Sequence, residues 1–363
     1  GAGTSTNMNC NEVICNLAAE KLGSVKGDYK RVSPNDHANF GQSTNDTYPT
    51  ALHLALMLRS NVLLKSVEDL VAAFYKKSEE FKGVLKMGRT HLQDAVPMTL
   101  GQEFHGWGFT IADEIKTIRE AQEHLKVINL GATAIGTTVT AHPDYPALAS
   151  KYLAQLTGID FKNSEDLIAA TSDCGAYVAI SSAMKSLAIK LTKVCNDLRL
   201  LASGPRCGLA EINLPQLQPG SSIMPGKVNP TQCEAVTMVA VQVMGNDVAV
   251  GMAASQGNFE LNVFMPVCMY NFLQSARLLA EAIVSFNDHC ACGIRANKEK
   301  MHHNLHNSLM LVTALNPYIG YENAAKTAKK AYKENISLKE ACVSLGFLTA
   351  ERFDEVFHPE QMV

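Results

Sequence analysis

The sequence predicts an all-α fold built around a bundle of very long helices. Its prolines leave five long stretches suited to helices, at about 46–81, 100–128, 164–201, 231–257 and 267–289. Alternating apolar and polar residues typical of strands are scarce, and no βαβ repetition is present. A helix of about thirty residues runs about 45 Å, which is longer than a small domain is wide. We therefore expect a long-helix bundle.

Two of these stretches differ in how their apolar residues are spread. Within 182–201, apolar residues such as Met184, Leu187 and Leu191 recur at helical spacing, which indicates one broad apolar stripe. The stretch 231–257 is apolar nearly all round. Such a helix has to be enclosed by other helices, so we expect it inside a large bundle or at a subunit interface.

The pattern changes after Asn287. Shorter helical stretches follow at about 298–315, 321–333, 337–345 and 350–357, and Thr349 is expected to cap the last of them. These residues predict a small, separate helical domain. The Gly-rich segment 130–137 is expected to be a loop between helices.

Composition argues against several classes of protein. An apolar share of 47% provides a large core, and a net charge of −3 without basic stripes argues against a nucleic-acid partner. No stretch reaches the roughly eighteen consecutive apolar residues of a membrane span. The ten cysteines are scattered, and His289, Cys290 and Cys292 lack a second Cys/His pair at zinc spacing. We expect a cytoplasmic protein with reduced thiols, no metal site and no membrane partner.

The strongest motif is the segment 220–230, with the sequence GSSIMPGKVNP. It places glycines, paired serines, a lysine and an asparagine in a flexible loop before a long helix, and such loops commonly cover sites. A phosphate-binding P-loop needs four residues between its glycines and a hydroxyl residue after the lysine. Here five residues intervene and Val228 follows Lys227. An ordinary surface loop is the remaining alternative.

Three further segments combine small polar residues with a helix start or a histidine. GQSTNDT at 41–47 puts hydroxyls, an amide and free backbone N–H groups at a helix N-terminus, so it is either an N-cap alone or also a carboxylate site. GAGTSTNMN at 1–9 is a similar run. In GRTHLQDA at 88–95, a lone histidine is more often structural, but beside Arg89 and Thr90, His91 could hydrogen-bond an anionic substrate.

Together these segments resemble one family. GAGTSTNMN, GQSTNDTYPTA, KMGRTHLQDAVPMTLGQEF, SGPRCGLAEINLP and PGSSIMPGKVNP are similar to sequences of the fumarase/aspartase superfamily, and the resemblance covers essentially the whole chain. It implies a mostly helical subunit whose central helices join a tetrameric helical bundle. It also implies a homotetramer with active sites shared between subunits, and no metal or organic cofactor.

The resemblance also suggests how the chain divides. Family members continue before the GAGTS element, whereas this chain begins there at Gly1, without a Met. We therefore expect the N-terminal domain to be mostly missing. The expected parts are 1–44 as its remnant, 45–292 as the central long-helix bundle and 293–363 as a small C-terminal helical domain.

The reaction implied by the resemblance is elimination from a C4 dicarboxylate to give fumarate. Its aci-carboxylate intermediate carries extra negative charge, which preorganised donors must stabilise. Ser221 would be the base, acting as an oxyanion stabilised by loop N–H groups and a nearby cation.

Further roles follow from the same resemblance. Lys227 and His91 complete the catalytic group, and Glu234 would orient His91. Lys227 and His91 would bind the carboxylate that becomes the aci-acid, together with Thr90 and Asn229. The other end of the substrate and the leaving group would be held by Thr4, Ser43, Thr44 and Asn45.

The leaving group divides the family, and this chain resembles both branches. GAGTS, QSTND, NLGATAIGT and EINLP are similar to aspartases, whereas NPTQCEA, GNFELNVF, SLMLVTALNP and HPEQMV are similar to class II fumarases. GAGTS and QSTND are expected to contact substrate directly, and NPTQCEA to pack mostly against helices. We therefore expect an aspartase that releases ammonia from L-aspartate. A class II fumarase acting on malate is the alternative, and a catalytically silent structural relative is the second alternative.

Overall fold

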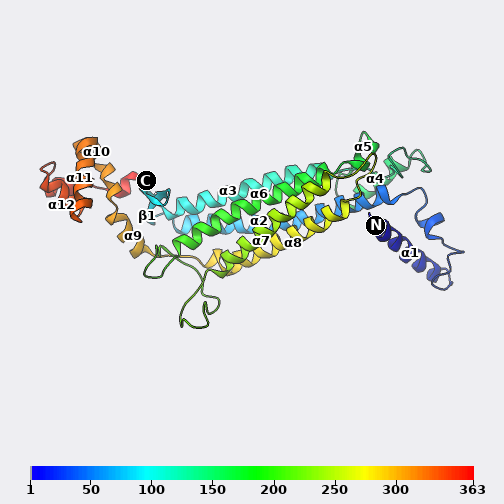
Figure 1. The fold of residues 1–363 in the computed structure, drawn as a ribbon, viewed down its shortest axis with the longest axis horizontal. Coiled ribbons are helices and arrows are strands. Elements are labelled where there is room, and N and C mark those ends of the chain that lie inside the picture. Colours follow the sequence, from blue (N-terminus) through cyan, green and yellow to red (C-terminus); the bar gives the residue numbers. More distant parts are fainter. Residues whose placement is uncertain (1) are drawn as a thin grey trace. The chain divides into compact units, whose positions relative to one another are not determined.

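The computed structural model describes residues 2–363, which fall into two compact units. Unit 1 comprises residues 1–68, 111–192 and 235–284, and unit 2 comprises residues 69–110, 193–234 and 285–363. The long helices, each with residues in both units, are α2 (Thr44–Glu80), α3 (Leu100–Leu125), α6 (Gly175–Leu201), α7 (Thr231–Ala254) and α8 (Met265–His289) (Figure 1). The predicted mostly helical fold is confirmed. The three-part division at residues 44 and 292 stays a prediction.

Inside each unit the five helices contact one another in the order α2, α3, α6, α7 and α8. In unit 1 the neighbouring pairs share side-chain hydrogen bonds: Gln122 to Ser60, Ser186 to Glu114, Ser181 to Asp247 and Asn246 to Ser275. In unit 2 the same pairs are joined by Ser78 to the Gly101 carbonyl, Trp107 to Asp197, Arg199 with Glu234, and Ser285 to Gln232. These polar contacts fix how each helix faces its neighbour, while apolar side chains fill the space between.

An aromatic cluster lies in the core of unit 2. The rings of Phe104 and Trp107, both on α3, lie 5.0 Å apart, and Phe74 of α2 lies 5.8 Å from Phe104. Phe286 of α8 lies 6.5 Å from Phe74. Buried aromatic rings of this size supply much of the apolar surface removed from water.

The start of α2 confirms the expected helix cap. The Asn45 N–H donates to Ser43 Oγ at 3.1 Å, and Asp46 Oδ1 accepts from the Ser43 N–H at 3.0 Å. Pro49 has no N–H, so it cannot donate to the Asn45 carbonyl as a regular helix residue would. Asn129 supplies that donor, with Nδ2 2.9 Å from the Asn45 oxygen.

Asp46 fastens the loop 129–138 to this helix start. Its side chain is fully buried and accepts the N–H groups of Gly131 at 3.1 Å and Thr133 at 3.0 Å. Burial raises the pKa of Asp46, and the backbone donors oppose that rise. The loop has no strand or helix of its own, as expected, so these contacts replace a regular hydrogen-bond ladder.

A β-hairpin lies where no strand was expected. β1 (Leu85–Thr90) and β2 (Gln93–Thr99) pair antiparallel, with a register shift between Met87 and Arg89. The shift at Gly88 breaks the two-residue period, and Pro97 sits inside β2, so the sequence pattern of a strand is weak. Short pairs complete the strands: β3 (Val127–Ile128) with β4 (Lys162–Asn163), and β5 (Ile212–Asn213) with β6 (Arg295–Ala296).

The remaining helices are short apart from the first. They are α1 (Thr4–Lys21), α4 (Tyr145–Thr157), α5 (Leu167–Ser172), α9 (Lys298–Asn307), α10 (Asn316–Ile319), α11 (Tyr321–Glu334), α12 (Leu338–Ser344) and α13 (Ala350–Val356). One π-helix, η1 (Pro34–Ala38), and three 3₁₀ helices, η2 (Ala291–Gly293), η3 (Leu309–Leu315) and η4 (Pro359–Met362), accompany them.

The C-terminal helices share one core with the hairpin. Met87 of β1 is fully buried among apolar side chains from residues 305–356. Thr349 caps α13 as expected, since its Oγ1 accepts the Arg352 N–H at 3.2 Å. The helix expected at 298–315 instead breaks at Ser308, whose Oγ accepts the Met310 N–H and starts η3.

α7 carries an exposed apolar stripe, here called the α7 stripe. Its side chains at Met238, Val241, Val248 and Met252 are each at least 60% exposed, and Gly245 lies between them at the same spacing of three or four residues. That spacing is typical of a seam between helices. Within residues 2–363, α7 alone is long and apolar enough to cross a membrane by length and composition, a property that core helices of soluble proteins share.

Replacing Asp46 by alanine is expected to destabilise the protein. The buried N–H groups of Gly131 and Thr133 would lose their acceptor, at about 1–3 kcal/mol for each unpaired group. The midpoint of urea unfolding, followed by circular dichroism, should fall accordingly. Asp36→Ala is the control, because Asp36 is exposed on η1 and such surface changes stay within about 0.5 kcal/mol. Equal midpoints for the two variants would mean that Asp46 does not fasten the loop.

Candidate functional site

The loop 220–230 is closed on itself by its own backbone. The Gly220 N–H donates to the Lys227 carbonyl at 2.7 Å, and Asn229 Nδ2 donates to the Gly220 carbonyl at 2.8 Å. A Cβ on Gly220 would lie 2.8 Å from the Lys227 oxygen and 2.9 Å from the Asn229 nitrogen. Only glycine therefore fits where the two ends of the loop meet.

Ser221 sits at the start of this closed loop with two donors aimed at its oxygen. Its Oγ accepts the N–H groups of Ile223 at 3.2 Å and Met224 at 3.1 Å. Two such donors stabilise negative charge on the oxygen that they share. The expected role of Ser221 as an oxyanion stays a prediction.

A cavity of about 650 Å³ in unit 2 brings together three of the predicted residues. Lys227 and Asn229 line it from the loop, and Glu234 lines it from the first turn of α7. Arg199, near the end of α6, also lines it and pairs with Glu234, with Nη2 3.7 Å from Oε1. Arg199 was not predicted, because a lone arginine on a helix carries no motif.

Thr90 and His91 lie in the same unit at the tip of the β-hairpin. Thr90 pairs with Gln93, so His91 and Leu92 form a two-residue turn, with φ of 54° and 61°. Both values are positive, as in a type I′ turn, which strongly favours Asn-Gly. Non-glycine residues in this conformation are strained, and such strain concentrates at functional sites.

Neither Thr90 nor His91 lines the cavity of about 650 Å³, and neither does Ser221. Glu234 forms its ion pair with Arg199, and the expected contact between Glu234 and His91 stays a prediction. Thr90, His91 and Leu92 are all exposed within this chain.

The N-termini of α1 and α2 lie together in unit 1. Asn7 on α1 donates to Thr44 Oγ1 at 3.2 Å and accepts from Thr47 Oγ1 at 3.2 Å. Gly3 backs onto α2 so closely that a Cβ would lie 2.5 Å from the Tyr48 ring. Two helix N-termini side by side present N–H groups and positive potential, which suits a carboxylate. Asn7 was not singled out in the sequence, although it lies in the GAGTSTNMN run.

The predicted residues thus form two groups. Thr4, Ser43, Thr44 and Asn45 belong to unit 1, and Asn45 Nδ2 is held by the Ala134 carbonyl at 2.7 Å. The group in unit 2 is Thr90, His91, Ser221, Lys227, Asn229 and Glu234. Gly1, the first residue of the GAGTS element, lies outside the described residues.

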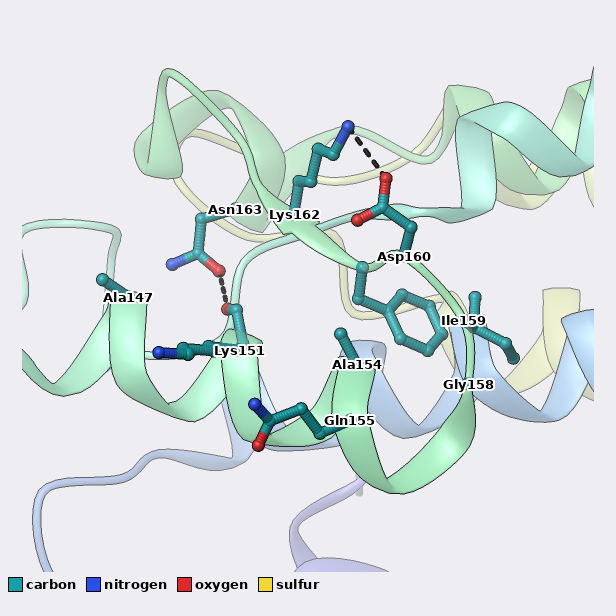
Figure 2. Close-up of a pocket in the computed structure, with 11 residues that line it drawn as sticks. Ala147, Lys151, Ala154, Gln155, Gly158, Ile159, Asp160, Lys162 and Asn163 are labelled. Atoms are coloured by element: carbon teal, nitrogen blue, oxygen red, sulfur yellow. Dashed lines mark hydrogen bonds and ion pairs between the residues drawn. The ribbon is translucent and has the colours of Figure 1, made fainter.

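A second cavity, of about 800 Å³, lies between α4 and β4 in unit 1 (Figure 2). Lys151 and Gln155 line it from α4, while Lys162 of β4 pairs with Asp160 at 2.9 Å. It contains no residue of either predicted group. We assign it no role.

Comparison with known proteins places the chain among lyases. Residues 1–245 match a family described as "Lyase", and residues 311–363 match one described as "Fumarase C C-terminus". The class II fumarate hydratase of Helicobacter pylori strain J99 is 55% identical, over 100% of this chain and 79% of that protein. The class II fumarate hydratase of Campylobacter jejuni is 54% identical with the same coverage.

Solved structures agree with these relatives. The structure titled fumarate lyase:delta crystallin from Brucella melitensis bound to cobalt has a TM-score of 0.96 at 47% identity, covering 100% of this chain and 78% of that one. The recombinant class II fumarase of Schistosoma mansoni has a TM-score of 0.93 at 38% identity, covering 99% of this chain and 79% of that one. The matches run along essentially this whole chain and cover 78–79% of these relatives.

The expectation of an aspartase is wrong, because relatives that are 54–55% identical are named class II fumarate hydratase. The structure shows why the aspartase-like motifs were a poor guide to the leaving group. Serine and threonine both offer a hydroxyl, and that of Thr44 is already bound by Asn7. The segment NPTQCEA was expected mostly to pack against helices, but it contributes Glu234 to the cavity. The fumarase-like motifs therefore deserved more weight.

Replacing Leu92 by glycine is expected to stabilise the hairpin turn. Leu92 is 71% exposed with φ of 61°, so little packing is lost. Backbone strain of about 1–3 kcal/mol is relieved, which exceeds the roughly 0.5–1 kcal/mol that the greater conformational freedom of glycine costs. The urea midpoint should rise. Leu58→Gly is the matched control, because Leu58 is exposed in the regular interior of α2 and glycine there costs about 1 kcal/mol. A lower midpoint for Leu92→Gly would show that the turn is unstrained.

Proposed function

This chain belongs to the fumarase/aspartase superfamily of lyases, and we propose that within it the chain is a class II fumarate hydratase that interconverts fumarate and L-malate. The observation that carries the proposal is the closed loop 220–230. It holds the Ser221 oxygen against two N–H donors and also carries Lys227, in a chain 55% identical along its length to a fumarate hydratase.

In the direction from malate, the first step removes a proton from the carbon next to a carboxylate. Ser221 takes that proton as an alkoxide, whose charge the N–H groups of Ile223 and Met224 stabilise. The electrons left behind move onto the carboxylate as an aci-acid. Lys227 and Asn229 bind this carboxylate, since they line one cavity beside the loop.

Thr90 and His91 bind the same carboxylate from the hairpin tip. Their exposure within one chain fits a site that a neighbouring subunit completes. Glu234 then orients His91 by accepting a ring N–H. A donor whose orientation is fixed in advance needs no rearrangement when charge develops on the substrate.

In the second step the electrons of the aci-acid form the C=C bond and the C–O bond breaks, and the departing hydroxyl takes up a proton from solvent to leave as water. The paired N-termini of α1 and α2 hold this hydroxyl and the second carboxylate. Four side chains from these helix starts do so: Thr4, Ser43, Thr44 and Asn45. Hydroxyl and amide groups suit a neutral leaving group, because each can donate to or accept from the substrate hydroxyl.

We expect the protein to convert fumarate to L-malate and back, measured by the ultraviolet absorbance of fumarate, and to release no fumarate from L-aspartate. Ser221→Ala should lower kcat by about 10²–10⁴-fold, as expected for loss of a positioned base. Its circular dichroism spectrum should not change, because the side chain is part of an exposed loop.

Ser222→Ala is the control, since Ser222 is the exposed neighbouring hydroxyl in the same loop. It should keep the wild-type rate. Near-normal turnover by Ser221→Ala would remove this residue from the mechanism. A folded wild-type oligomer without activity on fumarate or L-malate would overturn the proposed function and favour a catalytically silent relative.

The α7 stripe is expected to make the protein a homo-oligomer, proposed to be a tetramer. Light scattering should therefore give a mass several times the subunit mass of 39.3 kDa. Met238→Glu should lower that mass, because it buries a charge in the seam. Leu156→Glu is the control, since Leu156 is 86% exposed on α4, outside the stripe. A folded wild-type species at the subunit mass would contradict the proposal.

A further inference from the structure

A fully buried carboxylate, Glu211, joins the hairpin to two other parts of unit 2. Arg89 of β1 donates to it with both terminal nitrogens, Nη1 to Oε2 at 3.0 Å and Nη2 to Oε1 at 2.6 Å. Asn304 of α9 donates to Oε1 at 3.0 Å, and Lys86 Nζ lies 3.8 Å from Oε2. The carboxylate therefore has donors on both of its oxygens.

The charge state of Glu211 follows from these partners. Burial alone would raise the pKa of Glu211, but the hydrogen bonds from Arg89 and Asn304 and the charge of Lys86 outweigh burial and hold that pKa below its ordinary value. The hydrogen bond to Glu211 raises the pKa of Arg89 in turn. The pair is thus ionised at neutral pH, and a planar guanidinium on a carboxylate fixes orientation as well as distance.

The backbone of Glu211 is held as firmly as its side chain. Its N–H donates to the Leu201 carbonyl at the end of α6 at 2.8 Å, and its carbonyl accepts the Asn297 N–H at the start of α9 at 2.9 Å. Asn297 Nδ2 also donates to the Ala210 carbonyl at 2.9 Å. Glu211 is therefore fixed to α6 and α9 independently of the hairpin.

Arg89 connects Glu211 to the turn formed by His91 and Leu92. It directly precedes Thr90 and His91, and its Nε lies 3.9 Å from Asp94 on the opposite strand. The strands that lead to this turn are irregular, since their register shifts at Gly88. A Cβ at Gly88 would lie 2.8 Å from the Val96 carbonyl. A turn with two strained residues keeps its conformation only where the surroundings determine it.

We propose that Glu211 is a positioning residue for the hydratase reaction: through its two-pronged contact with Arg89, it holds the turn that presents Thr90 and His91 to the substrate carboxylate. The inference rests on the proposed function. Stability alone is a poor reason for this pair, because the desolvation of a buried ion pair offsets much of its attraction. Precise placement is a better reason, since a misplacement of about 1 Å can cost about 10²-fold in rate.

The test uses Glu211→Gln in the assembled oligomer, assayed for fumarate hydration. We expect kcat/KM to fall by about 10–10²-fold, with KM raised and kcat lowered, because the turn binds a charge that is present in the substrate and larger in the transition state. Arg89→Lys should act in the same direction, since lysine keeps the charge but cannot make the two-pronged contact. If Glu211→Gln does not fold, Arg89→Lys carries the test.

Glu103→Gln is the matched control. Glu103 binds Lys86 at the base of β1 at 2.8 and 3.0 Å, so its loss also disturbs a buried ion pair of the hairpin but leaves Arg89 in place. This variant should lower the urea midpoint while keeping the wild-type kcat/KM. Wild-type kcat/KM in both Glu211→Gln and Arg89→Lys would overturn the inference. So would a fall in Glu103→Gln as large as theirs.

Hydrogen exchange of the amides at 89–94 separates this inference from the proposed function. Exchange in the turn should become faster in Glu211→Gln and Arg89→Lys but not in Glu103→Gln, whatever the protein catalyses. A wild-type protein without hydratase activity would defeat the proposed function, while unchanged exchange in Glu211→Gln would defeat the positioning role.

Discussion

Long helices are stable in water only when their apolar faces are covered along the whole length, and this constraint governs the chain. Five helices of at least 24 residues pack on one another, with a polar contact at each neighbouring pair in both units, while the α7 stripe stays exposed within this chain. Most side chains in the middle of these helices pack against neighbouring helices. The residues of the proposed site lie instead at helix starts and connections: the first turns of α1 and α2, the hairpin between α2 and α3, and the loop before α7.

These connections share one physical device, which is the backbone N–H group. Two N–H groups meet the Ser221 oxygen, and three more meet the buried Asp46 carboxylate. Backbone donors cannot rotate away as side chains can, so they suit a site that must stabilise negative charge without rearrangement. The same feature makes glycine necessary at Gly220, where the loop closes on its own backbone.

Local signals in the sequence predicted local structure well. The long helical stretches, the cap at Ser43 and the cap at Thr349 each depend on residues within a few positions of one another. The hairpin was missed because its alternation is interrupted at Gly88 and Pro97. Arg89 was noted only as a neighbour of His91, because its partner Glu211 lies 122 residues away and no local pattern links them. The leaving group was misjudged because similar hydroxyls occur in both branches of the family.

The proline near the start of α2 ties two distant parts of the chain together. Because Pro49 has no N–H, the Asn45 carbonyl stays bonded to water until Asn129, 84 residues further along, arrives to donate to it. A newly made chain thus carries an unfinished helix start until the loop at 129 has been synthesised and folded. The two positions are also coupled in any redesign: an apolar residue of similar size at 129 would leave the Asn45 carbonyl without this donor unless position 49 regained an N–H.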